Sequence, residues 1–70
     1  MEKLVLRSEY ITLGQLLKAM GLVYDGVEAK IRIQSGEARV NGEVDTRRGR
    51  KLYDGDVVEF AGSEIAVVKK

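Results

Sequence analysis

The densest group of charged side chains in this 70-residue chain is Arg47-Arg48-Gly49-Arg50-Lys51, with four cations in five positions. A guanidinium group can bind two oxygens of one phosphate, so closely spaced arginines suit a phosphate backbone. A run of charge is often only a solvated surface, but four like charges repel one another and call for a reason. We therefore expect these four cations to contact a polyanion, with Gly49 letting the backbone bend so that they converge.

The net charge of +1 hides a separation of charge along the chain. Residues 30–51 contain seven basic and three acidic side chains, a net charge of +4, whereas residues 52–68 contain four acidic side chains and no basic one. Segregation of this kind creates a local field that the total charge does not reveal. The basic segment adds Lys30, Arg32 and Arg39 to the candidate phosphate contacts.

The chain lacks the residue types on which most catalytic sites depend. It has no cysteine, which excludes thiolate nucleophiles and thiolate zinc sites, and no histidine, the usual general base. A domain of this size buries only about 60% of its unfolded surface, too little for a deep catalytic cleft. Asp54, Asp56 and Glu59 offer carboxylates, but Asp-Gly-Asp is typical of a turn. We expect no catalytic residue, metal site, cofactor or small-molecule substrate.

The apolar residues are too scattered for a membrane segment. No run approaches the roughly 20 apolar residues of a membrane span, and the first seven residues carry three charges among their aliphatics. No proline, linker or repeat divides the chain. We therefore expect a single domain over residues 1–70, without a membrane partner and located in the cytoplasm.

The first helix is predicted from signals at both of its ends. Thr12 and Gln15 have the spacing of a capping box, and Gly21 is a typical residue to follow the last helical turn. Between them lies an apolar stripe with helical spacing, formed by Leu13, Leu16, Leu17 and Met20.

Residues 27–33 alternate between apolar and charged side chains, which is a strand pattern. Three features favour a helix instead: Asp25 with Glu28 forms a second capping box, the span of about ten residues suits a helix, and Gly36 supplies a stop. As a helix, the segment would bury Ala29 and Ile33 and leave Val27 and Ile31 partly exposed on another face.

Short strands with turns between them follow the second helix. We predict strands at 37–40, 43–44, 57–60 and 65–68, and turns at Asn41-Gly42, Asp54-Gly55 and 61–63. Asn-Gly is the strongest short hairpin signal because both residues tolerate the positive φ of a type I′ turn. The expected fold is α+β, with two short packed helices followed by a small, mostly antiparallel twisted sheet that an N-terminal strand at 3–7 joins. The predicted core is Leu13, Leu16, Leu17, Met20, Ala29, Ile33, Val40, Val44, Leu52 and Val58.

Three motifs, in this order and spacing, resemble those of a known family. They are Leu13-x-x-Leu16-Leu17-Lys18-x-x-Gly21-Leu22, then Gly26-x-Glu28-Ala29-Lys30-x-x-Ile33-x-x-Gly36-x-x-x-Val40-Asn41-Gly42, then Lys51-Leu52-x-x-Gly55-Asp56-x-Val58. Over residues 12–60 the chain resembles the S-four-type RNA-binding domain, also called the alpha-L RNA-binding motif. Its length and the segment 43–51 are most similar to small stand-alone bacterial YaaA-like proteins.

The resemblance implies a non-catalytic protein that binds structured RNA, with ribosomal RNA favoured and transfer RNA as an alternative. It implies a role at the ribosome, in assembly, rescue or translation control. The binding face would comprise both helices and the segment 47–51. The assigned site residues are Lys18, Lys30, Arg39, Arg47, Arg48, Arg50 and Lys51, with Arg32, Asn41 and Tyr53 as further candidates.

Structural roles compete with several of these assignments. Arg32 projects away from Lys30 on the same helix, so solvation explains it nearly as well, and turn chemistry alone explains Asn41. Tyr24 and Tyr53 could stack on bases or pack at the rim of the core. The alternative function is a protein-interaction module that docks through the Val27/Ile31 stripe or a free sheet edge. Replacing the four cations at 47–51 by alanine is expected to leave the fold intact.

Overall fold

Two helices and two β-sheets form the structure, a computed structural model that describes residues 1–70. The elements follow the order β1 (Glu2–Leu6), β2 (Ile11–Thr12), α1 (Leu13–Ala19), α2 (Gly26–Gln34), β3 (Ala38–Val40), β4 (Glu43–Val44), β5 (Lys51–Leu52), β6 (Val57–Phe60) and β7 (Ser63–Lys69). The segment that alternated like a strand is therefore a helix, as predicted. Neither helix has the length and apolar character needed to cross a membrane.

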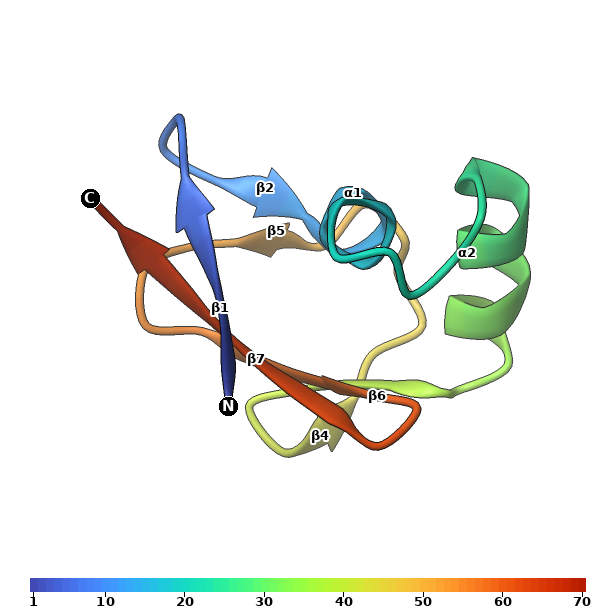
Figure 1. Ribbon diagram of the computed structural model, residues 1–70. Helices are drawn as coiled ribbons and strands as arrows, with labels where there is room; N and C mark the ends of the chain where they lie inside the picture. The colour runs from blue at the N-terminus through green and yellow to red at the C-terminus, as the bar shows by residue number, and fades with distance from the viewer.

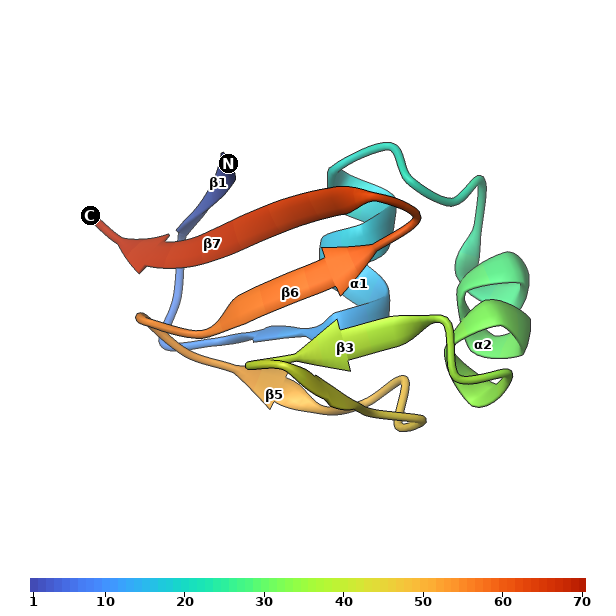
Figure 2. The same ribbon diagram turned by 90° about the horizontal axis from the view of Figure 1, so that it is seen from below.

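The larger sheet has five strands in the order β1-β7-β6-β3-β4. All neighbours are antiparallel except β1 and β7, which run parallel with Glu2 opposite Ile65. Figure 2 shows β7, β6 and β3 side by side. The α+β fold and the N-terminal strand that joins the sheet are confirmed. The second sheet, an antiparallel ribbon of β2 and β5, was not predicted.

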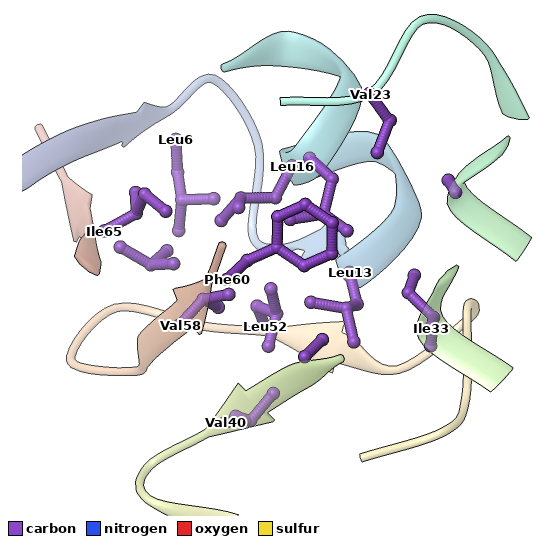
Figure 3. Close-up of a cluster of buried hydrophobic side chains, with 14 residues drawn as sticks. Leu6, Leu13, Leu16, Val23, Ile33, Val40, Leu52, Val58, Phe60 and Ile65 are labelled. Atoms are coloured by element: carbon purple, nitrogen blue, oxygen red, sulfur yellow. The ribbon is translucent and has the colours of Figure 1, made fainter. Parts of the chain in front are cut away.

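The core lies between the five-stranded sheet on one side and α1 with the β2–β5 ribbon on the other (Figure 1). Phe60 lies among Leu13, Leu16 and Val58 in the middle of it (Figure 3). The fully assembled core consists of Leu6, Leu13, Leu16, Leu17, Val23, Ala29, Ile33, Ala38, Val40, Leu52, Val58, Phe60, Ile65 and Val67.

Eight of the ten predicted core residues are buried, and Met20 is partly buried against the core. The prediction for Val44 is wrong, because its side chain is exposed. Val44 belongs to β4, a two-residue strand at the edge of the sheet whose residues both face solvent. The next residue, Asp45, is the one that turns inward.

The helix ends follow the predicted capping chemistry with one difference. Thr12 and Gln15 form the complete capping box at α1, and Gly21 follows the helix with a φ of 71°. At α2 the Asp25 carboxylate accepts a hydrogen bond from the Glu28 backbone N–H at 2.9 Å. Glu28, however, accepts from the backbone N–H of Tyr24 rather than that of Asp25. The second capping box is therefore incomplete, and Glu28 fixes the chain one residue before the cap.

The Asn41-Gly42 turn has the predicted type I′ geometry, with φ values of 52° and 85°. The Asn41 side chain also braces the sheet: its Oδ1 accepts from the Val57 N–H at 2.9 Å, and its Nδ2 donates to Asp56 Oδ1 at 3.0 Å. Both ends of the amide are thus occupied within the protein, which gives Asn41 a structural role.

Candidate nucleic-acid interface

The loop that carries the arginines, residues 45–50 between β4 and β5, is docked on the first turn of α1. The Leu13 N–H donates to the Arg50 carbonyl at 2.8 Å, and the Gly14 N–H donates to the Arg48 carbonyl at 2.9 Å. These N–H groups belong to a helical turn that has no carbonyl partner within its own helix. The loop therefore completes the helix, and the helix in turn fixes the position of the loop.

Asp45 organises two of the arginines. Its carboxylate is only 6% exposed and accepts hydrogen bonds from Arg47 Nε at 3.1 Å, from Arg47 Nη2 at 2.8 Å and from Arg50 Nη1 at 2.6 Å. The Arg47 backbone N–H adds a fourth bond at 2.9 Å. The bonds from Arg47, together with the one from Arg50, hold the pKa of Asp45 well below its usual range, although burial alone would raise it. We call Asp45, Arg47 and Arg50 the Asp45 cluster.

The Asp45 cluster orients the two arginines and leaves some of their N–H donors free to bind a ligand. A guanidinium has five N–H donors, and side-chain bonds to Asp45 engage two on Arg47 and one on Arg50. The Arg47 side chain is 68% exposed and that of Arg50 is 30% exposed. The cations therefore converge because of Asp45. The backbone does bend at Arg48-Gly49, where the Arg50 N–H donates to the Arg47 carbonyl at 3.1 Å. The bend does not depend on glycine, because the φ of Gly49 is not positive and an added Cβ would meet no atom within 4 Å.

A groove of about 350 Å³ lies between α1, the start of α2 and the arginine loop. Lys18 and Arg48 are its charged lining residues, and none of its lining residues is acidic. The Arg48 stem lies against α1 at Gly14, where an added Cβ would come within 2.6 Å of Arg48 Cγ. The remaining lining residues are Thr12, Gln15, Gly26, Ala29 and Gly49.

Two further cations flank this groove. Lys30 follows Gly26 by four residues on α2, so it lies on the helix side that Gly26 presents to the groove. Lys51 lines a shallow surface with Arg47, Gly49 and Arg50, on the other side of the loop. We call Lys18, Lys30, Arg47, Arg48, Arg50 and Lys51 the basic face.

Arg32 lies outside the basic face, and two glutamates of the protein bind its guanidinium. Its guanidinium contacts Glu37 at 3.0 Å and Glu28 at 3.4 Å, and it lies 4.6 Å from the centre of the Phe60 ring. The hydrogen bond that Arg32 donates to Glu37 is the main reason that the pKa of Arg32 is raised. These contacts tie α2 to the sheet, which is a structural role.

The structure does not bring Arg39 to the basic face. Ala38 and Val40 point into the core, so Arg39 between them points to the outer surface of the sheet. There it is paired in register with Glu59 and shares a depression with Glu37 and Glu64. No group of three acidic side chains is placed to hold a metal ion.

Sequence reasoning missed Asp45 and Tyr10 as members of this region. An acidic residue two positions before an arginine run was visible, but nothing local distinguished it from a solvated aspartate. Tyr10 lies beside Tyr53 only because β2 pairs with β5, with ring centres 6.0 Å apart.

Comparison with known proteins shows which family this chain belongs to. The S4 domain family model matches residues 4–68. The chain belongs to the S4 domain family. RlbA of Bacillus subtilis, a candidate ribosome maturation protein, is 53% identical over 55 residues, which are 79% of this chain and 78% of RlbA. YbcJ of Escherichia coli, a candidate RNA-binding protein, is 41% identical over 59 residues, or 84% of each chain.

The fold of this S4 domain also matches an experimental structure. The solution structure of Escherichia coli YbcJ, described as having an alpha-L motif involved in RNA binding, superposes with a TM-score of 0.73 at 38% identity. The match covers 97% of this chain and 87% of YbcJ. The resemblance to the S-four-type domain and the expected α+β fold are both confirmed.

Proposed function

We propose that this S4 domain protein is a non-catalytic, cytoplasmic binder of structured RNA, with ribosomal RNA as its target and ribosome maturation as its context. The observation that carries the proposal is the groove between α1, α2 and the arginine loop, which Lys18 and Arg48 line without any acidic residue. The names of RlbA and YbcJ support the same direction. Transfer RNA is the alternative RNA partner.

The basic face suits recognition of backbone shape rather than base sequence. A-form RNA keeps its sequence in a deep, narrow major groove that side chains do not reach, so a small rigid surface reads phosphates and overall shape. The Asp45 cluster holds Arg47 and Arg50 in place before RNA arrives, which lowers the entropy lost on binding. A folded junction, in which several backbones converge, should engage more of these cations than a plain duplex does.

The test compares a folded ribosomal RNA fragment with a plain duplex of equal length, over a series of salt concentrations. The variants are Lys18→Met and Arg48→Met, which keep the aliphatic stems and remove charges that the protein does not pair. Arg39→Met is the matched control, since it removes an exposed arginine from the outer surface of the sheet. We expect the first two variants to weaken binding and to lower the salt slope by about one each.

Arg47 and Arg50 are poor choices for this test, and their bonds to Asp45 argue against the expectation that alanine at all four loop cations would leave the fold intact. Removing both side chains would take three of the four hydrogen bonds from the Asp45 carboxylate and leave only the one from the Arg47 backbone N–H, which destabilises the protein. Equal losses in the Arg39→Met control, or equal affinity for duplex and folded fragment, would contradict the proposal. Lys30→Ala should weaken binding about equally for unrelated sequences of the same fold.

The protein-interaction alternative is favoured by one observation: Val27 and Ile31 lie on the solvent side of α2, as predicted, and both are exposed. A partner bound through this stripe would lose little affinity in high salt. RNA bound through the basic face would lose affinity steeply. The salt dependence of binding therefore distinguishes the two functions.

A further inference from the structure

The outward surface of the β2–β5 ribbon carries an aromatic pair next to the basic face. Ile11 is paired in register with Leu52, which is fully buried, so this pair points to the core. Tyr10 and Tyr53 extend the same register by one position and therefore face outward, because side chains alternate along strands. The ribbon, labelled β2 and β5 in Figure 1, leads directly into α1 at one end.

The two tyrosine rings are close together but not closed to solvent. Their centres are 6.0 Å apart and their planes are tilted by 48°. Tyr10 is 40% exposed and Tyr53 is 47% exposed, so each ring keeps a large open area. Lys51 Nζ lies 4.9 Å from the centre of the Tyr10 ring. This arrangement offers aromatic surface and a cation at the same place.

Lys51 links the aromatic pair to the phosphate-binding surface. It lies over Tyr10 and also lines the shallow surface that Arg47, Gly49 and Arg50 form. A phosphate bound by Lys51 would thus have the Tyr10 ring beside it, in position for an adjoining base. Aromatic side chains next to cations are the usual means by which proteins bind unpaired bases.

From this juxtaposition we propose that Tyr10 and Tyr53 form a stacking site for an unpaired base in the RNA whose backbone the basic face holds. The proposal rests on the proposed function and narrows its target to RNA with an unpaired nucleotide beside a helical segment. Tyr24 does not belong to the site: it is 89% exposed and lies before α2, and it has no aromatic neighbour.

The experiment uses two RNA hairpins that differ only in one bulged nucleotide, which is 2-aminopurine. The protein contains no tryptophan, so the fluorescence of this base can be excited without interference from the protein. We expect the wild type to bind the bulged hairpin at least about fivefold more tightly than the paired one. We also expect the fluorescence of the bulged base to change on binding as it stacks.

The variants separate stacking from support of the core. Tyr10→Leu and Tyr53→Leu should remove the preference for the bulge, whereas Tyr10→Phe and Tyr53→Phe should keep it because the ring is retained. Tyr24→Leu is the matched control and should also keep it. Should a leucine variant fail to fold, the absence of a fluorescence change in the wild-type complex would still overturn the stacking site.

The two levels of the proposal fail in different ways. Equal, salt-dependent binding of both hairpins by the wild type, with no fluorescence change, would overturn the stacking site and leave RNA binding intact. Loss of the preference in Tyr24→Leu but not in the other leucine variants would also overturn it. Absence of binding to either hairpin and to the folded ribosomal fragment would overturn the proposed function itself.

Discussion

Asp45→Asn should weaken RNA binding even though it makes the arginine loop more positive. Asparagine has nearly the same shape and can keep the bond from the Arg47 backbone N–H, but it loses the charge-assisted bonds from Arg47 and Arg50. Hydrogen bonds to charged groups contribute about 1.5–3 kcal/mol. Both arginines reach solvent, which screens the attraction, so we expect the free energy of unfolding to fall by about 1–2 kcal/mol.

For a domain of this size, that loss corresponds to a fall in Tm of roughly 4–16 °C, measurable by circular dichroism. The loss in RNA affinity follows from orientation. Fixing a flexible side chain on binding costs about 0.5–1.5 kcal/mol, and the variant must fix two arginines that the wild type already holds. The added positive charge offsets part of this cost. The net effect should be a loss of roughly five- to thirtyfold, read from a binding titration at physiological salt.

Glu64→Gln is the charge-matched control, because it removes one negative charge from an exposed position on β7 that has no ion-pair partner. It should leave RNA affinity unchanged or slightly raise it. If Asp45→Asn behaved like this control and bound RNA equally or more tightly, the Asp45 cluster would only neutralise charge. The reasoning that it orients the arginines would then be refuted.

Three further predictions concern single positions. The pKa of Asp45 in the folded protein lies below its unfolded value of about 3.9. Its contribution to stability is therefore complete above about pH 5 and is lost as the pH falls through the folded pKa. Unfolding curves should show the stabilities of the wild type and Asp45→Asn converging in acid. Gly14→Ala should lower RNA affinity several-fold in a titration despite the better helix propensity of alanine, because the new Cβ displaces Arg48. Ala61→Gly should raise the free energy of unfolding by about 0.5–1 kcal/mol in a denaturant titration, because Ala61 has a φ of 51°.

The sequence was sufficient where a signal is local. The Thr12–Gln15 box, the glycine after each helix and the Asn41-Gly42 turn each act over a few residues, and all three lie where they were predicted. The ribbon of β2 and β5 could not be predicted, because strands of two residues have no periodicity to detect. Its existence depends on pairing between segments that are about forty residues apart in the sequence.

The same limit applies to the site. The run of arginines was visible, but their division into two that are held by Asp45 and one that lines the groove depends on where the loop docks on α1. Arg39 and Arg32 were assigned by charge alone. Strand alternation directs Arg39 to the opposite surface of the sheet, and two glutamates engage Arg32. Charge along the chain therefore indicated a polyanionic ligand, while tertiary contacts determine which cations lie on the same surface.

The parallel pairing of β1 with β7 has a consequence for how the protein folds. It joins segments at opposite ends of the sequence, with Glu2 opposite Ile65, so the entropy of closing a long loop must be overcome before these contacts form. The β6–β7 and β3–β4 hairpins are local and should form earlier. At a synthesis rate of about 5–20 residues per second, β7 is made roughly 3–13 s after β1. Over that interval Leu6 has no sheet to cover it, so the domain should complete its folding only after β7 has left the ribosome.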